Sequence, residues 1–146
     1  MADVKLGFEE KVYAHFATAQ AALPYLNRKS SITLVSAVSA MAAVPGTAGI
    51  GAANAAVTAL VPILAVELKP IRVNTVSPGV IDTPWWDPFP AEQKEAMFKE
   101  FAGKTPAGRV GTPEDVAHAI VFLIENGFVT GQTIITDGGL RFTASA

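Results

Sequence analysis

The sequence of 146 residues contains no cysteine and only two histidines, and these absences exclude several kinds of chemistry. Without a thiol the chain forms no disulfide, uses no thiolate nucleophile and offers no cysteine ligand to zinc. His15 and His118 lie far apart and belong to no ligand cluster, so no metal site is expected. Lysine and arginine total 11 against 13 acidic residues, without any basic concentration, which argues against a nucleic-acid partner.

Signals for export and for a membrane are also missing. Residues 1–6 lack the basic-then-apolar order of a signal peptide, so a cytoplasmic location is expected. No charged residue occurs from Ala37 to Val66, a run long enough to cross a bilayer. However, prolines and glycines interrupt it, Pro45 and Pro62 among them, and no aromatic or basic anchors flank it. We therefore interpret this run as buried structure and expect no membrane span.

What the sequence does contain is a high apolar content, 50% of all residues, which is enough to build one core. Short apolar segments rich in β-branched residues predict three buried strands, Ser31–Ser36, Ile71–Val76 and Gln132–Thr136. Helical periodicity and capping signals predict four helices, Phe8–Leu23, Ile50–Leu68, Ala91–Phe101 and one that follows the cap at Thr112. This order predicts a single α/β domain over residues 1–146, with three parallel strands, flanking helices and right-handed crossovers.

Certain side chains are expected to be buried in this fold. The first strand is expected to be covered on both faces. The tyrosines, Tyr13 and Tyr25, are expected to be packing residues. The buried face of the last helix is expected to consist of Val116, Ile120, Leu123 and Ile124.

Three motifs occur in an order that resembles the C-terminal half of the short-chain dehydrogenase/reductase family. They are IRVNTVSPGVIDT (Ile71–Thr83), GRVGTPEDVAHAIVFL (Gly108–Leu123) and TGQTIITDGG (Thr130–Gly139). Two shorter segments, Gln20–Leu26 and Ala65–Leu68, are similar to the same family. The resemblance implies a partial Rossmann-like fold, the second half of a doubly wound sheet that binds NAD(P). The chain is therefore expected to be a truncated domain of this kind, since full members have about 250 residues.

The resemblance implies proton transfer by a tyrosine whose pKa is lowered by a lysine four residues later. A serine steadies the substrate oxygen, and an asparagine anchors a water relay. The positions of the tyrosine, lysine, serine and asparagine are held here by Ile50, Asn54, Ala37 and Lys11. None of the four chemical roles is retained. Lys11 is either a solvated helix residue or, where burial lowers its pKa, a replacement acid.

The resemblance also implies a wall beside the nicotinamide of the cofactor. Its residues are Pro78, Gly79, Ile81 and Thr83. In the family the backbone at the Ile81 position and the Thr83 hydroxyl would hold the carboxamide. The Pro-Gly pair is equally a turn that the fold needs after a strand.

Other motifs have both a functional and a structural interpretation. The glycines of 46–51 begin ten positions after Ser36, too far from the strand for a phosphate-binding turn, and they favour close helix packing instead. Trp85 and Trp86 either line an apolar pocket or pack beneath a loop. The turn Asp137–Gly139 is expected to be structural.

Three functional hypotheses follow. The first is a pseudoenzyme with a binding or assembly role, which needs no cofactor as an isolated chain. The second is an oxidoreductase whose nucleotide-binding half comes from another chain or a longer reading frame, and which then uses NAD or NADP. The third is a binder of small apolar ligands that uses the Trp85/Trp86 loop. In each case we expect a homo-oligomer assembled through the helix Ile50–Leu68, whose apolar surface covers more than one side.

Overall fold

The computed structural model describes residues 2–143 as alternating helices and strands. The strands are β1 (Ser31–Val35), β2 (Arg72–Pro78) and β3 (Thr133–Thr136). The α-helices are α1 (Ala2–Gly7), α2 (Ala14–Ala22), α3 (Ala48–Glu67), α4 (Ala91–Lys104) and α5 (Pro113–Glu125). The predicted order of elements is confirmed, and most boundaries shift by a few residues. The expected helix Phe8–Leu23 instead begins at Ala2 and is interrupted by a π-helix at Phe8–Tyr13.

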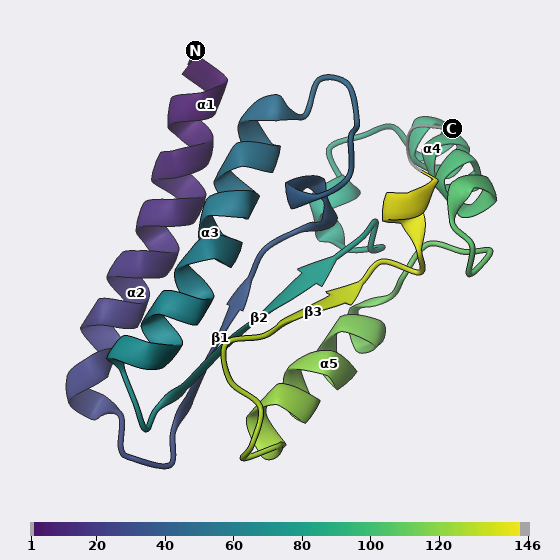
Figure 1. Cartoon of the computed structure of the whole chain (residues 1–146). Helices are drawn as coiled ribbons and strands as arrows, with labels where there is room; N and C mark the ends of the chain where they lie inside the picture. Colours follow the sequence, from purple (N-terminus) through teal and green to yellow (C-terminus); the bar gives the residue numbers. More distant parts are fainter. Residues whose placement is uncertain (1, 144–146) are drawn as a thin grey trace.

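The three strands form one parallel sheet in the order β1-β2-β3 (Figure 1). Leu34 of β1 lies opposite Thr75 of β2, and Val76 of β2 lies opposite Ile134 of β3. The central strand is the most deeply enclosed, because residues 73–77 are all buried. The predicted α/β class with three parallel strands and flanking helices is confirmed.

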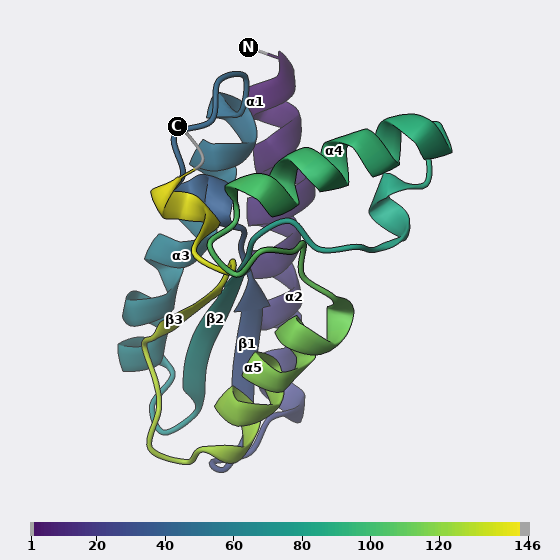
Figure 2. The ribbon, with the colours of Figure 1, turned by 90° about the vertical axis from the view of Figure 1, so that its right-hand side faces the viewer.

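Helices cover both faces of the sheet. Neighbouring residues of β2 show the division, since alternate side chains of a strand point to opposite faces. Val73 packs in the cluster formed with α3, whereas the Arg72 guanidinium reaches the carboxyl end of α5. Figures 1 and 2 accordingly place α1, α2 and α3 on one face and α5 on the other, with α4 beyond the carboxyl ends of the strands. The connection from β1 to β2 runs over one face of the sheet, and the connection from β2 to β3 runs over the other. Because the three parallel strands lie in sequential order, these two crossovers have opposite hands. The expectation that both are right-handed was therefore wrong.

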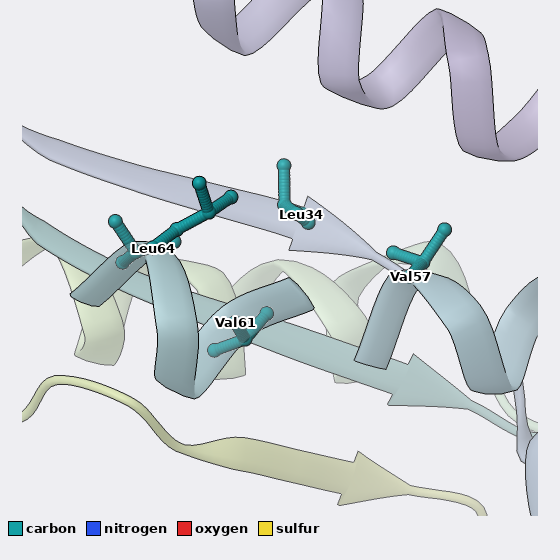
Figure 3. Close-up of a cluster of buried hydrophobic side chains, with 5 residues drawn as sticks. Leu34, Val57, Val61 and Leu64 are labelled. Carbon is teal, nitrogen blue, oxygen red and sulfur yellow. The ribbon is translucent and has the colours of Figure 1, made fainter. Parts of the chain in front are cut away.

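The core lies between α3 and the sheet. Figure 3 shows Val57, Val61 and Leu64 of α3 facing Leu34 of β1. Among the described elements α3 is the one helix long and apolar enough to cross a membrane by length and composition. Its inner residues pack against β1 and β2, as in the core helix of a globular domain. Burial accounts for the lack of charge on this inner face only, because the outward residues Ile63 and Val66 are exposed and uncharged as well.

Several side chains are more exposed than expected. Only Leu34 of the five β1 residues is buried, because β1 is an edge strand of the sheet. Tyr13 and Tyr25, expected to be packing residues, are 61% and 87% exposed. Ile124 of α5 is 52% exposed, whereas its neighbour Leu123 is fully buried.

Arg72 ties the start of β2 to the end of α5. Its guanidinium donates to the carbonyl oxygens of Leu123 at 2.6 Å and Ile124 at 2.7 Å, and to that of Val129 at 3.3 Å. The last carbonyls of a helix have no partner within the helix and carry partial negative charge. One cation therefore satisfies both the helix end and the loop that follows it.

We expect Arg72→Met to lower the free energy of unfolding by about 2 kcal/mol or more, because it leaves these carbonyls without their charged donor. Thermal and urea denaturation followed by circular dichroism measure the change. Arg28→Met, at an exposed loop position, is the control and should unfold like the parent chain. Equal stability of the two variants would contradict the assigned role of Arg72.

Candidate functional site

A cavity of about 630 Å³ opens where β1 and β2 end. Val35 and Ser36 border it at the end of β1, and Pro78 and Gly79 border it at the end of β2. Ligands of open α/β sheets bind at the carboxyl ends of the strands. The position and the volume both suit a small-molecule site.

The structure brings together the residues that the sequence singled out separately. The four substituted catalytic positions all line this cavity, namely Lys11, Ala37, Ile50 and Asn54. The four residues of the expected nicotinamide wall line it as well, namely Pro78, Gly79, Ile81 and Thr83. Both tryptophans, Trp85 and Trp86, complete the mouth from the loop after β2.

Asn54 is a fully buried amide, where the family pattern has a lysine. Its Nδ2 donates to Ser39 Oγ at 3.0 Å, whereas its Oδ1 has no hydrogen-bond partner among the described residues. An amide brings no positive charge to the cavity. Asn54 therefore holds the turn after β1 against α3 and cannot lower the pKa of a neighbouring group as a lysine would.

The hydroxyl nearest to the substituted serine position is that of Ser36, and it is engaged in hydrogen bonds within the protein. Ser36 is buried, and its Oγ donates to the backbone oxygen of Asn54 at 2.9 Å. Thr58 donates to Ser36 Oγ at 3.0 Å, so this hydroxyl is satisfied on both sides. Ala37, which follows, presents only a methyl group. At position 37 the cavity therefore has no hydroxyl to steady a substrate oxygen.

Lys11 lies on an irregular turn that the sequence did not predict. Residues Phe8–Tyr13 form a π-helix between α1 and α2. The ring of His15 lies 2.7 Å from the carbonyl oxygen of Lys11, and since a carbonyl only accepts, Nδ1 of His15 carries the proton. Burial lowers the pKa of the Lys11 amine below its ordinary value. The side chain is thus partly withdrawn from water, unlike that of a solvated helix lysine.

The residues of the expected nicotinamide wall line the cavity, but one of their backbone groups already has a partner. Trp86 donates its indole N–H to the carbonyl oxygen of Ile81 at 2.9 Å. A Cβ at Gly79 would lie 2.8 Å from the Cα of Asp137, so the strand ends approach closely and only glycine fits. Thr83 is half-buried beside this backbone. The wall is therefore a rigid structural turn that also lines the cavity.

The turn after β3 is organised around one carboxylate, that of Asp137. Burial favours a higher pKa, but the backbone N–H groups of Arg141 and Gly139 and the Arg141 guanidinium outweigh it and hold the pKa of Asp137 below its usual value. Gly139 adopts φ 89° against Pro106, a conformation that favours glycine. These contacts support the structural interpretation of the turn.

The tryptophans line the cavity and also pack under the loop. Trp85 and Trp86 meet edge to face at 4.8 Å between ring centroids. Trp86 makes a second edge-to-face contact with Phe98 of α4 at 5.3 Å. Lys94 of α4 pairs with Asp82 at 2.9 Å. The two alternative interpretations are therefore compatible, because α4 fixes the loop in which the tryptophans border the cavity.

The residues present do not fit a complete dinucleotide. A diphosphate needs a glycine turn directly after a strand, but β1 is followed by a 3-10 turn at Val38–Ala40 and α3 begins only at Ala48. Gly46 lies in an exposed turn, and Gly51 lies where a Cβ would meet the carbonyl oxygen of Ser39 at 2.7 Å. Gly51 thus serves close packing, whereas Gly46 serves a turn with positive φ. Within residues 2–143 no group of three or more metal-ligating side chains occurs.

Sequence reasoning missed part of the cavity wall. Ser39 contributes a hydroxyl, and Val116, Ala117 and Ile120 of α5 close one side. The apolar periodicity of α5 predicts a stripe that faces the core, and Val116 and Ile120 of that stripe line the cavity. No signal in the sequence shows that one stripe of a helix serves both the core and a cavity.

Comparison with known proteins agrees with this geometry. The profile of the family described as Enoyl-(Acyl carrier protein) reductase matches residues 1–141. The 3-oxoacyl-(acyl-carrier-protein) reductase FabG of Thermotoga maritima is 39% identical over 131 residues, which cover 86% of this chain and 52% of that protein. The 3-oxoacyl-(acyl-carrier-protein) reductase of Rattus norvegicus is 46% identical over 79 residues, covering 54% of this chain and 30% of that protein.

A solved structure is similar over almost the entire chain. The crystal structure of a small-chain dehydrogenase in complex with NADPH matches with a TM-score of 0.92 and 36% identity, covering 95% of this chain and 64% of that one. The chain thus spans about half the length of the Thermotoga relative and less than two thirds of this structure. The profile match and the shared fold show that the chain belongs to the short-chain dehydrogenase/reductase family.

Proposed function

We propose that this chain is a short-chain dehydrogenase/reductase relative without hydride-transfer chemistry of its own, acting as a cytoplasmic binding or assembly protein. The observation that carries the proposal is the cavity lining. It holds Ile50, Asn54 and Ala37 where the family pattern has a tyrosine, a lysine and a serine. No phenol is present among the described residues that line it.

Each substitution removes a separate contribution to rate. Ile50 exchanges no proton, and a positioned general acid is typically worth about 10²- to 10⁴-fold. Ala37 donates no hydrogen bond to a developing oxyanion, and such a donor is worth about 10²- to 10³-fold. Asn54 brings no charge to shift a pKa. Together these losses support a cavity that binds without reducing.

We expect the purified chain to show no turnover of alcohols or ketones with NAD(H) or NADP(H), measured by nicotinamide absorbance. The Thermotoga maritima reductase, assayed in parallel, is the positive control. Turnover by this chain that disappears in Lys11→Met would overturn the proposal and assign the acid role to Lys11.

We expect oxidised or reduced cofactor to bind no tighter than about 1 mM, or roughly 4 kcal/mol, because the wall at Gly79 and Thr83 can meet only the nicotinamide end. The diphosphate has no glycine turn after a strand to receive it. Isothermal titration calorimetry with NAD⁺ and NADP⁺ makes the measurement, and a micromolar isotherm for either one would refute the expectation.

Assembly through α3 is part of the proposal. The outward side of this helix exposes Ile63 at 56% and Val66 at 69%, and between Ala48 and Val66 the helix carries no charge. Such a surface favours contact with a second copy over contact with water. A two-fold dimer is the simplest closed arrangement.

We expect Ile63→Glu to convert the assembly to monomers, because it places an unpaired carboxylate in an apolar contact. Light scattering coupled to size exclusion measures the mass. Ile124→Glu is the matched control, since Ile124 is 52% exposed on the helix of the opposite face and should leave the mass unchanged. A monodisperse monomer of the parent chain at micromolar concentration would refute assembly altogether.

A second candidate function is an NAD(P)-dependent oxidoreductase whose nucleotide-binding half comes from another chain or a longer reading frame. The partial span of the relatives and the retained wall favour it. Nicotinamide-dependent turnover that appears when the chain is mixed with cell extract, and that is lost in Lys11→Met, would support this candidate. A reading frame upstream that encodes a strand followed by a glycine-rich turn would support it as well.

A further inference from the structure

The cavity contains a single ionisable side chain among the described residues that line it, and that side chain is Lys11. The remainder of the wall is mostly apolar. The apolar contributors are Val35, Ile50, Val80, Val116 and Ile120, with Trp85 and Trp86 at the mouth. A ligand that fills this space therefore meets hydrocarbon on several sides, the neutral polar side chains of Ser39, Asn54 and Thr83, and one charged group, the Lys11 amine.

The amine has no counter-ion in the described part of the chain. No carboxylate oxygen lies within 4 Å of Lys11 Nζ, whereas Lys5, Lys94 and Lys104 each pair with an acid. A partly buried ammonium without a partner loses hydration without recovering a charge interaction. An anionic group placed beside it would restore that interaction.

The backbone around Lys11 is built to present this side chain. The π-helix Phe8–Tyr13 widens the helix at that point, and π-bulges are frequent at functional sites. The His15 ring donates to the Lys11 carbonyl at 2.7 Å, and the Ala14 backbone N–H donates to the same oxygen. The turn is thus stabilised by a specific contact.

We propose that this cavity binds a small amphiphilic carboxylate, with the carboxylate on the Lys11 ammonium and the apolar body against Ile50 and the α5 wall. The inference deepens the proposed binding role and rests on it. The volume of about 630 Å³ lies within the range of small-molecule sites. Discrimination comes from the charge pair, since a neutral ligand of the same shape buries the same hydrocarbon but leaves the ammonium unpaired.

The test compares octanoate with octan-1-ol, which share one chain and differ in charge. Trp85 and Trp86 are the two tryptophans of the sequence and border the cavity, so intrinsic fluorescence reports occupancy. We expect octanoate to bind at least tenfold more tightly than octan-1-ol. Lys11→Met should raise the Kd for octanoate at least tenfold and leave octan-1-ol unchanged. Lys11→Arg, which keeps the charge, should retain most of the preference.

Lys99→Met on α4 is the matched control, because it removes an exposed lysine outside the cavity and should bind octanoate like the parent chain. Circular dichroism shows whether each variant is folded. If Lys11→Met does not fold, the affinities of Lys11→Arg for octanoate and octan-1-ol provide the test. Equal affinities for acid and alcohol, or no fluorescence response to octanoate up to millimolar concentration, would overturn the inference.

A third probe separates ion pairing from covalent capture. Octanal followed by borohydride would add a C8 alkyl group to a nucleophilic lysine, detected as a mass increase on the Lys11 peptide. Labelling of Lys11 by octanal without any binding of octanoate would overturn the carboxylate assignment. It would indicate that the cavity takes a carbonyl compound instead. None of these readouts uses hydride transfer from nicotinamide, so failure here and failure of the proposed function are distinguishable.

Discussion

The polar contacts between the end of β1 and the middle of α3 set the geometry on which the cavity depends. Ser36 Oγ donates to the backbone of Asn54, Thr58 donates to Ser36, and Asn54 Nδ2 donates to Ser39. All three bonds join α3 to the chain just after the strand. Buried hydrogen bonds of this kind fix relative position more strictly than apolar contacts, because an unpaired polar group inside a core is costly. These hydrogen bonds therefore fix the position of the cavity floor relative to β1.

Much of the fold was predictable because its signals are local. The cap at Thr112 with the following Pro113 located the start of α5, and β-branched runs located the three strands. The motifs then identified the family, and the structure placed all four substituted positions in one cavity. The identity of these four site positions could therefore be predicted from the sequence.

The remaining features depend on long-range contacts. The opposite hands of the crossovers follow from α5 crossing to the far face, where Arg72 holds its end. The π-helix at Phe8–Tyr13 is accompanied by a side-chain contact from His15, and no periodicity of the sequence reveals either. The exposure of Tyr13 and Tyr25 reflects how much of the helical layer this chain leaves uncovered. The spacing of residues along the sequence shows which of them can share one face of a helix. It does not show which face packs against another element of the fold.

The close approach at Gly79 makes the ends of β2 and β3 one physical unit. With Asp137 Cα only 2.8 Å from where a Cβ would be, neither strand end can move without displacing the other. The carboxylate of Asp137 is in turn held by Gly139 and Arg141. Glycine should consequently be retained at position 79 wherever the turn at 137–141 approaches it as closely. The shape of the cavity wall formed by residues 78–83 thus depends on a turn more than fifty residues away in the sequence. Natural variation in that turn would reshape the cavity without altering any residue that lines it on the β2 side.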